Sequence, residues 1–560
     1  MLSIINTIVS GLCHPDLFDH PVEQFKVLET HSSVVLLTGP FAYKFKRAVN
    51  FGFLDYSTLE RRHEACLQEL QINSRYAPDL YLAVVPVYGT VEAPSLQPQG
   101  PVQEYAIKMR QFGQEQLLAV MAQKGQLTPA IAEAIADQMA AFHERAERVV
   151  LEADMGTPAC VRRWVMENFE ALAPLVQTGL QREKLAETQV WMQQKLDALE
   201  PLLIQRRRDG FVRDCHGDLH LGNMIWQDDQ VLFFDAIEFN EELRWIDVQS
   251  ELAFAVMDLE DRGLPALANG LLNRYLSRNG DYAGLALFPL FWVYRALVRA
   301  KVGLLQRGNS EAALQHLDHL LTLCHRLIHP QPPFLVLMHG LSGSGKSWLA
   351  ACVSGAFQAI QLRSDVERKR LHGLAAGADS PSQPAAGLYE AGASERTYAH
   401  LFALSAQLLE QGFPVVVDAA FLTRAQRAPF LTLARRVANA TESNTNNSTV
   451  GNTNNSTVGN TENATESNTK IFMLLLVLNV PTEELKRRIA MRREKNGSLS
   501  PEKRDPSDAD EQVLAWQLNT RELPDSNEAP MLVLDAQWPL RRSAWMERIA
   551  KAIDRTIAPG

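Results

Sequence analysis

The pattern of apolar and polar positions divides the chain into segments with different periodicity. In about the first hundred residues, short apolar runs alternate with polar turns, and residues 57–76 show helical spacing. After residue 111 the apolar positions follow helical spacing as far as about residue 328. This pattern predicts a small β-rich lobe over residues 1–110 and a larger α-rich lobe over residues 111–330.

The second part of the chain has a different pattern. Prolines within residues 329–333 end the helical region, and an apolar run at 334–340 follows directly. From there apolar strands alternate with helices, which predicts an α/β domain with a parallel sheet over residues 331–560. Residues 440–469 interrupt this domain with an Asn-, Thr- and Ser-rich tract in which NTNNSTVG occurs twice. Because this tract has almost no apolar side chains, we interpret it as an expanded loop without a core of its own.

Composition and charge narrow the class of protein. Of the 560 residues, 46% are hydrophobic and 21% are charged, which is typical of globular domains. The net charge of −10 does not favour a nucleic-acid partner, although a local basic groove stays open. The six cysteines form no CxxC pair, and the apolar runs are too short to span a bilayer, so we expect a cytoplasmic protein without membrane association.

Arg295 and Arg299 lie one turn apart in an apolar helix, where they either line a substrate cleft or form buried ion pairs.

A motif with the chemistry of phosphoryl transfer lies at residues 216–223, which have the sequence His-Gly-Asp-Leu-His-Leu-Gly-Asn. Asp218 and Asn223 are five residues apart, and Asp235 ends the apolar run that follows. Phosphoryl transfer needs a carboxylate that accepts a hydrogen bond from the attacking hydroxyl group. It also needs oxygen ligands that hold Mg²⁺ against the phosphates. The three side chains supply both kinds of group.

This motif, with the aspartate that follows it, resembles the aminoglycoside phosphotransferase family, which is related to the protein kinases. The resemblance implies a two-lobed α+β fold like that of the protein kinases. It implies that Asp218 is the catalytic carboxylate, that Asn223 and Asp235 are metal ligands, and that His216 braces the loop. It also places an adenine-binding hinge at residues 104–110.

The amino-terminal lobe contains candidate partners for this loop. Lys44 ends the run Phe-Ala-Tyr-Lys, which resembles the strand that carries the phosphate-binding Lys of kinases. Lys46, two residues later on the same strand face, is its rival. The resemblance implies that this Lys pairs with a helical Glu, and we assign Glu69 to that role with Glu64 as the alternative.

A second phosphate-binding motif lies at residues 340–347, where Gly-Leu-Ser-Gly-Ser-Gly-Lys-Ser matches GxxxxGK[ST] between a strand and a helix. Glycines let the backbone N–H groups turn toward phosphate oxygens, and the helix N-terminus adds positive potential. Lys346 is expected to reach the β- and γ-phosphates, and Ser347 is expected to ligate Mg²⁺. The expected nucleotide-binding residues are Gly340, Ser342, Gly343, Ser344, Gly345, Lys346 and Ser347.

Further candidates follow the phosphate-binding loop. Asp418 ends the strand at 415–418 and fits the acid that holds Mg²⁺ through water in phosphate-loop enzymes. This half resembles the small P-loop kinases, namely polynucleotide 5′-kinase domains, zeta toxins and gluconate kinases. That resemblance implies that Asp365 activates the acceptor hydroxyl and that Arg368, three residues later, positions the substrate. It also implies that arginines form a lid over the transferring phosphate, and the candidates are Arg488, Arg492 and Arg493. The alternative is that these arginines only make a surface helix basic.

Together the two halves resemble a bacterial bifunctional family of aminoglycoside phosphotransferase-like and P-loop ATP-binding proteins. We therefore predict a phosphotransferase with two centres that uses Mg²⁺ and ATP, or GTP, and phosphorylates hydroxyl groups of small molecules. One alternative is that the C-terminal half phosphorylates the 5′-hydroxyl of a nucleic acid, and another is a nucleotide-gated regulatory ATPase with no small-molecule acceptor. The motifs specify neither acceptor and no oligomeric state.

Overall fold

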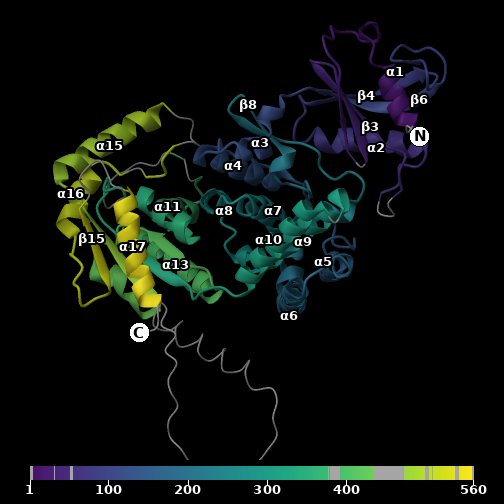
Figure 1. Ribbon diagram of the computed structural model, residues 1–560. Helices are drawn as coiled ribbons and strands as arrows, with labels where there is room; N and C mark the ends of the chain where they lie inside the picture. The colour runs from purple at the N-terminus through teal and green to yellow at the C-terminus, as the bar shows by residue number, and fades with distance from the viewer. Residues whose placement is uncertain are drawn as a thin grey trace, which may run out of the picture. The chain divides into compact units, whose positions relative to one another are not determined.

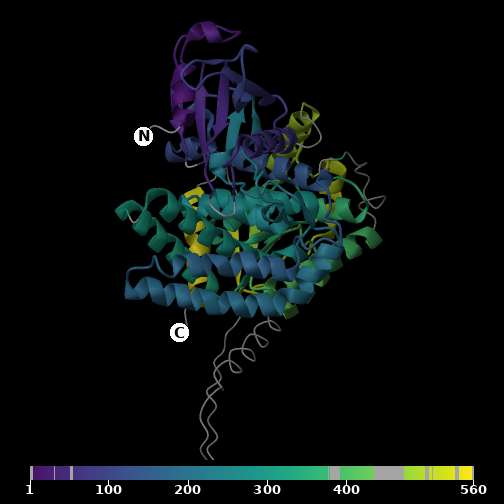
Figure 2. The same cartoon turned by 90° about the vertical axis from the view of Figure 1, so that its right-hand side faces the viewer.

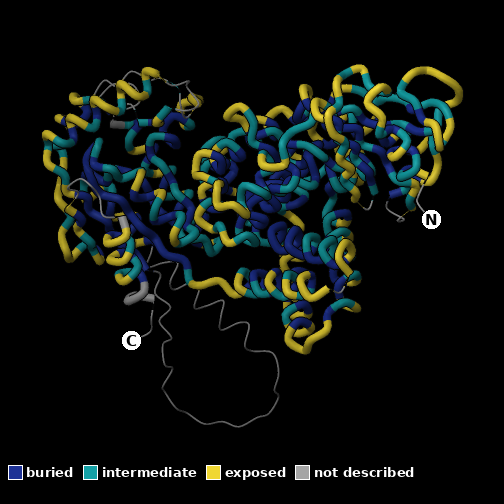
Figure 3. Tube along the Cα trace, turned by 45° about the horizontal axis from the view of Figure 1, so that its top comes forward, coloured by how far each residue is buried: buried dark blue, intermediate teal, exposed yellow. Residues whose placement is uncertain are grey.

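The chain divides into two compact units. The computed structural model describes residues 4–30, 32–50, 54–308, 310–375, 378, 391–433, 472–498, 504–507, 509–535 and 542–557, so the repeat tract at 440–469 lies outside the described residues. The first unit comprises Met1–Leu264 and Leu287–Ile328, and the second comprises Pro265–Ala286 and His329–Gly560. The residues buried in each unit are dark blue in Figure 3. The second unit thus contains a segment, 265–286, that comes from the helical part of the sequence before residue 330.

The amino-terminal lobe of the first unit is an antiparallel sheet, drawn in purple and blue in Figures 1 and 2, with the strand order β1-β2-β3-β6-β4-β5. Its elements are α1 (Ile4–Gly11), β1 (Lys26–Glu29), β2 (Ser33–Leu37), β3 (Phe41–Lys46), α2 (Leu59–Asn73), β4 (Tyr81–Gly89), β5 (Pro94–Ser95) and β6 (Val102–Arg110). The Thr58 side chain caps α2 by accepting a hydrogen bond from the Arg61 N–H. Strand β3 pairs with β2 on one side and with β6 on the other, which fixes the position of Lys44 near the middle of the sheet.

The larger lobe of the first unit is mainly helical. Its helices are α3 (Leu118–Gln123), α4 (Pro129–Arg145), α5 (Pro158–Leu172), α6 (Gly179–Arg208), α7 (Val248–Asp261), α9 (Phe288–Arg307) and α10 (Glu311–Ile328). Two short strand pairs frame the predicted catalytic loop: β7 (Val212–Asp214) with β10 (Trp245–Asp247), and β8 (Met224–Gln227) with β9 (Gln230–Phe233). Helix α7 is buried from Val248 to Leu259, so its polar side chains need partners inside the lobe.

One segment of the described chain, Ala283–Arg307, is long and apolar enough to cross a membrane by length and composition. Its mean hydropathy is 1.3, but 72% of its most apolar window is buried inside the structure. Burial of this extent is typical of a core helix.

The second unit has a five-stranded parallel sheet with the order β12-β13-β11-β14-β15. The strands are β11 (Phe334–His339), β12 (Ile360–Arg363), β13 (Val415–Asp418), β14 (Phe472–Asn479) and β15 (Met531–Asp535). The helices are α8 (Pro265–Asn279), α11 (Lys346–Phe357), α12 (Ser364–Leu371), α13 (Ala391–Glu410), α15 (Thr482–Gly497), α16 (Glu511–Thr520) and α17 (Arg542–Ile557). An apolar core joins one face of this sheet to α11 and α17. Both predicted fold classes, the two-lobed α+β module and the parallel α/β module, are confirmed.

Helix α8 explains why residues 265–286 belong to the second unit. The amide side chains of Asn269 and Asn273 both donate hydrogen bonds to the Ala359 carbonyl, at 3.1 and 3.0 Å. The Asn273 side-chain oxygen accepts a hydrogen bond from the Gln361 N–H at 2.7 Å. These bonds satisfy backbone groups at and just before β12, the edge strand, which would otherwise be open to another chain.

Candidate active sites

The predicted catalytic loop of the first unit lies between β7 and β8. The Asn223 amide nitrogen donates hydrogen bonds to the Asp218 carbonyl at 2.9 Å and to Asp218 Oδ2 at 3.0 Å. Because the nitrogen is engaged in this way, the amide oxygen of Asn223 is the atom that could ligate a metal. His216 is fully buried and accepts the Asp218 N–H at Nδ1, so its Nε2 donates to the Phe234 carbonyl at 2.9 Å. His216 therefore joins the loop to the segment that carries Asp235.

The structure brings Lys44, Glu69 and Asp235 together. Lys44 Nζ lies 2.7 Å from Glu69 Oε1 and 2.5 Å from Asp235 Oδ1. Asp235 has a positive φ of 63°, and its N–H donates a hydrogen bond to the Tyr81 hydroxyl at 3.0 Å. A non-glycine residue in this left-handed region is strained, and strain of this kind persists where surrounding bonds hold it.

Lys46, the rival of Lys44, also contacts Glu69, but in a different environment. Its side chain is 2% exposed and forms ion pairs with Glu69 Oε2 and with Glu238. Glu238 also accepts a hydrogen bond from the Tyr56 hydroxyl at 2.6 Å. Only Lys44 of the two lysines also contacts Asp235. The alternative helix partner, Glu64, lies on the exposed side of α2.

The electrostatic surroundings keep the two aspartates ionised. Burial would raise the pKa of Asp235, but the charge of Lys44 outweighs this effect and the pKa is lowered. Burial would likewise raise the pKa of Asp218, but His220 and then Arg299 lower it well below its usual range. An ionised Asp218 can accept a hydrogen bond from an attacking hydroxyl, and an ionised Asp235 can ligate Mg²⁺.

The predicted adenine-binding hinge at residues 104–110 needs correction. These residues form most of β6, which is hydrogen-bonded to β3 on one side and to β4 on the other. Their backbone groups are therefore committed to the sheet and cannot bind adenine.

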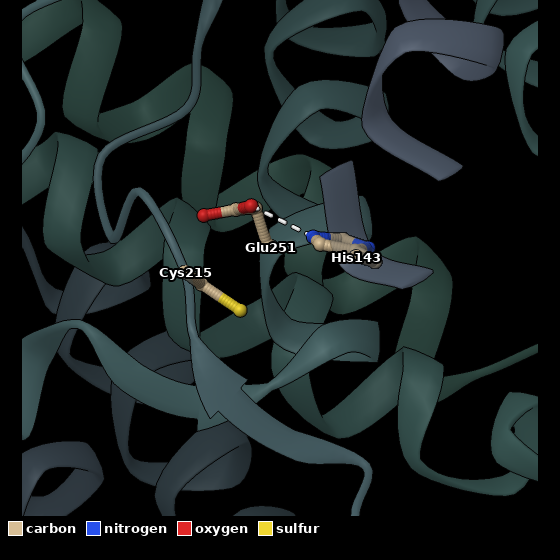
Figure 4. A group of neighbouring side chains, drawn as sticks. All are labelled: His143, Cys215 and Glu251. Atoms are coloured by element: carbon tan, nitrogen blue, oxygen red, sulfur yellow. Dashed lines mark hydrogen bonds and ion pairs between the residues drawn. The ribbon is translucent and has the colours of Figure 1, made fainter. Parts of the chain in front are cut away.

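Sequence reasoning missed Glu251, which holds the catalytic loop from the buried helix α7. Glu251 Oε1 accepts hydrogen bonds from the N–H groups of His216, at 2.6 Å, and Gly217, at 2.9 Å. Glu251 Oε2 bonds to His143 Nε2 at 2.8 Å, as Figure 4 shows. The signal in the sequence was an acidic residue inside an otherwise apolar helix, which needs a buried partner.

Glu251, His143 and Cys215 are all types of residue that bind metals, and their candidate ligand atoms lie within 4.8 Å of one another. Both carboxylate oxygens of Glu251 are, however, already occupied by N–H donors. Burial also raises the pKa of the Cys215 thiol well above its usual value, so the thiolate that a metal needs is disfavoured. The cluster is better suited to holding the loop than to binding a metal.

In the second unit the phosphate-binding loop joins β11 to α11, as predicted. Gly343 and Gly345 have φ values of 81° and 92°, which favour glycine, and a Cβ atom on Gly343 would lie 2.9 Å from the Leu485 carbonyl oxygen. The Lys346 ammonium donates a hydrogen bond to the Leu341 carbonyl at 2.9 Å, so it lies folded over the loop. The Gln517 side chain accepts the N–H of Ser342 at 2.8 Å.

Acidic groups face this loop from two strands. Asp418, at the end of β13, is 5% exposed, and burial raises its pKa against the opposing charges of Arg363 and Lys346. Asp365 is the second residue of α12, directly after β12, and accepts a hydrogen bond from Arg368 at 3.0 Å. Burial would raise the pKa of Asp365, but Arg368 and its other partners lower it. The structure thus brings the predicted acids Asp365 and Asp418 within electrostatic reach of Lys346.

The three lid candidates on α15 differ in their surroundings. Arg488 forms an ion pair with Glu484 at 2.6 Å, and its Nη1 lies 3.4 Å from the Ser344 carbonyl of the loop. Arg492 donates a hydrogen bond to the Ala509 carbonyl at 2.6 Å. Arg493 is exposed. Of the three, only Arg488 contacts the phosphate-binding loop in the described structure.

A pocket of about 260 Å³ adjoins the same loop. It is formed by the loop, by the ends of β11 and β14, by β15 and by the segment before β15. The pocket lies beside Gly340 and Ser344, and its volume is sufficient for part of a ligand that is bound to the loop.

Comparisons with known proteins match both units. A family model described as "Phosphotransferase enzyme family" matches residues 54–288, and one described as "AAA domain" matches residues 335–524. The uncharacterized protein Rv2004c of Mycobacterium tuberculosis is 32% identical over 432 residues, which cover 76% of this chain and 84% of the relative. The uncharacterized protein Mb2027c of Mycobacterium bovis matches to the same extent.

Solved structures resemble each half at low identity. A choline/ethanolamine kinase family protein from Mesorhizobium loti is 12% identical, with a TM-score of 0.37, over 58% of this chain and 95% of that chain. A gluconokinase from Sinorhizobium meliloti is 18% identical, with a TM-score of 0.23, over 40% of this chain and 99% of that chain. At these values the likenesses carry no argument about substrates.

Proposed function

The chain belongs to the family of these mycobacterial proteins, with a phosphotransferase domain followed by a P-loop domain, and on that premise we propose that it is an ATP- and Mg²⁺-dependent phosphotransferase with two catalytic centres. Each centre transfers a γ-phosphoryl group to a hydroxyl group of a small molecule. The observation that carries this proposal is the convergence of Lys44, Glu69 and Asp235 beside the Asp218–Asn223 pair. Such a constellation provides a cation for phosphates, oxygen ligands for a metal and a carboxylate for the acceptor.

In the first centre, Asp218 accepts a hydrogen bond from the acceptor hydroxyl and orients its oxygen toward the phosphorus atom. The amide oxygen of Asn223 and the carboxylate of Asp235 are the groups that would hold Mg²⁺, which neutralises charge on the phosphates. Lys44 lies 2.5 Å from Asp235, so it is placed to contact the same phosphates. Glu69 holds Lys44 in that position.

In the second centre, the N–H groups of residues 340–347 and Lys346 bind the phosphates, and Ser347 with Asp418 would hold Mg²⁺. Asp365 is ionised and partly exposed, with a side-chain exposure of 28%, so it can accept the proton of an acceptor hydroxyl. Arg368 lies 3.0 Å from Asp365 and fixes its orientation. Arg488 is the group placed to contact the transferring phosphoryl from α15.

The test is phosphoryl transfer from γ-labelled ATP into a cytosolic metabolite extract. We compare the natural chain with Asp218→Asn and Lys346→Ala, and the matched controls are Asp229→Asn and Lys551→Ala at exposed positions. A labelled small molecule that is lost only with Asp218→Asn, or only with Lys346→Ala, assigns its formation to one centre. Release of free phosphate alone by the natural chain would refute the proposal and favour a nucleotide-gated regulator.

A further inference from the structure

Arg299, on α9, extends toward the catalytic loop of the first unit without reaching a carboxylate. The preceding arginine on the same helix face, Arg295, donates hydrogen bonds to the Gly217 carbonyl at 2.9 Å and to the Ser250 carbonyl at 3.3 Å. Arg299 has one contact instead, with Nη1 at 3.4 Å from His220 Nε2, and its buried Nε has no hydrogen-bond partner in the described part of the chain. Of the two interpretations of this pair, buried ion pairing is therefore not found among the described residues.

The contact with His220 does not satisfy Arg299. His220 Nδ1 accepts the N–H of Gly222 at 3.0 Å, so the proton of a neutral ring lies on Nε2. This nitrogen faces Asp218 Oδ2 at 3.5 Å, where it can donate. An N–H group cannot accept a hydrogen bond from Arg299 as well. Arg299 and His220 therefore present N–H donors side by side, next to the catalytic carboxylate.

The charge of Arg299 acts through space on Asp218 and Asp258, whose pKa values it helps to lower, but the described structure contains no ion pair between Arg299 and either acid. Asp258 is fully buried, and its Oδ2 is occupied by the N–H of Leu221 at 2.9 Å and by Arg262 at 3.1 Å. Asp218 is paired with Asn223. Neither acid forms an ion pair with Arg299 among the residues that the structure describes. The guanidinium of Arg299 therefore keeps N–H donors that no carboxylate accepts, including its buried Nε, and its planar fork suits phosphate and carboxylate groups.

We propose that Arg299 and His220 form an anion-binding subsite beside Asp218 that takes a phosphate or carboxylate group. The group comes either from the transferring phosphoryl of the nucleotide or from an acidic substituent on the acceptor, because both would lie beside Asp218 during transfer. The inference rests on the proposed function, since Asp218 is the catalytic group only if the first unit is a phosphotransferase. The proposal adds Arg299 to the residues that contact a ligand. If the bound group belongs to the acceptor, the proposal also identifies the acceptor as a small molecule with an acidic substituent.

The experiment uses the full chain with Lys346→Ala, so that nucleotide binding reports mainly on the first unit. Calorimetry measures the affinities of Mg²⁺·ADP and of Mg²⁺ with the non-hydrolysable ATP analogue AMPPNP. It then measures the affinity of inorganic phosphate for the AMPPNP complex. The variants are Arg299→Met and Arg299→Lys, and Arg307→Met is the control because it removes the same charge from an exposed position of the same helix.

If the subsite binds the transferring phosphoryl, Arg299→Met weakens AMPPNP binding by about tenfold to a hundredfold and leaves ADP binding unchanged. If it binds an acidic acceptor, the variant weakens phosphate binding to the AMPPNP complex by a similar factor. Arg299→Lys keeps part of either effect, because it retains the charge without the fork. Unchanged ADP affinity shows that the variant is folded. If Arg299→Met behaves like Arg307→Met in both titrations, the subsite does not exist.

A different result separates this inference from the proposed function. If the chain carrying Lys346→Ala binds no nucleotide at all, the first unit is not the nucleotide site that we propose. Inorganic phosphate titrated into the nucleotide-free protein still tests Arg299 in that case. Loss of phosphate binding in Arg299→Met supports the subsite, and equal binding in both variants overturns it.

Discussion

Replacement of Glu251 should separate the stability of the first unit from its catalysis. Glu251 is 1% exposed and accepts the N–H groups of His216 and Gly217, which immediately precede Asp218. Glu251→Ala leaves these two buried donors and His143 without an acceptor. At about 1–3 kcal/mol for each of the three unsatisfied groups, the free energy of unfolding of the first unit should fall by about 3–9 kcal/mol.

Glu251→Gln should behave differently, because its amide oxygen can still accept both N–H groups. The bonds to the loop lose the assistance of the negative charge, and the amide nitrogen, which cannot accept a hydrogen bond, replaces the oxygen that faces His143 Nε2. The unfolding free energy should therefore fall by about 2–3 kcal/mol. Burial would raise the pKa of Glu251, but the hydrogen bond from His143 outweighs this effect and lowers it. A carboxyl group whose pKa is lower in the folded state than in the unfolded state stabilises the fold at pH values above its unfolded pKa. This stabilisation is lost as the pH falls toward the folded pKa. The natural chain should therefore lose stability below about pH 4.5, and Glu251→Gln should lose less.

The assay is urea unfolding of the full chain, followed by measurement of the rate of first-centre phosphoryl transfer and its KM for ATP. Every variant also carries Lys346→Ala. Glu251→Ala should lower kcat by about a hundredfold with little change in KM, because Asp218 moves while Lys44 stays in place. Exposed Glu133 on α4 provides the control, Glu133→Gln. The reasoning is refuted if Glu251→Ala unfolds at the same urea concentration as Glu133→Gln, or if KM rises while kcat stays constant.

Three further predictions follow from the remaining contacts. Lys44→Met should lower first-centre transfer by about a hundredfold with little loss of stability, whereas Lys46→Met, which leaves the buried Glu238 without its cation and Glu69 with Lys44 alone, should destabilise the first unit by about 3–5 kcal/mol. Steady-state kinetics and urea unfolding measure the two effects, and equal stability losses would contradict the assignment. Arg488→Met should lower second-centre transfer by about tenfold or more, whereas Arg493→Met should not; equal rates in the two variants would remove Arg488 from the site. Burial lowers the pKa of His339 to about 4, so the second unit should lose about 3 kcal/mol of stability as the pH falls from 6.5 to 4. Urea unfolding at several pH values measures this loss, and the unfolding free energy of His339→Gln should depend less on pH.

The parts of the two sites that sequence reasoning predicted are those fixed by local chain geometry. Asp218 and Asn223 lie in one short loop, and the phosphate-binding loop is a continuous motif between a strand and a helix. The contact of Lys44 with Glu69 crosses 25 residues, and it was predicted from the resemblance to the kinases, which implies a lysine on this strand paired with a glutamate on the helix that follows. Asp235 was found because it follows an apolar strand.

The parts that were missed depend on pairings between distant residues. Glu251 is 35 residues from His216, and no periodicity relates an acid in a buried helix to the N–H groups of a loop. Glu238 is 192 residues from Lys46, so the second lysine could be considered only as a rival of the first. The position of α8 beside β12 depends on side-chain amides that bond to a strand about 90 residues later. Long-range hydrogen bonds of this kind carry no local signal in the sequence.

The two centres use the same elements with opposite electrostatic results. In both, an aspartate follows a buried strand and faces a lysine. In the first centre Lys44 contacts Asp235 directly, and the pKa of Asp235 is lowered despite burial. In the second centre Lys346 instead donates to the Leu341 carbonyl, and burial raises the pKa of Asp418. Arg363 and Lys346 oppose this rise without outweighing it, so under the proposed function a divalent cation at Asp418 would add the positive charge that favours the ionised acid.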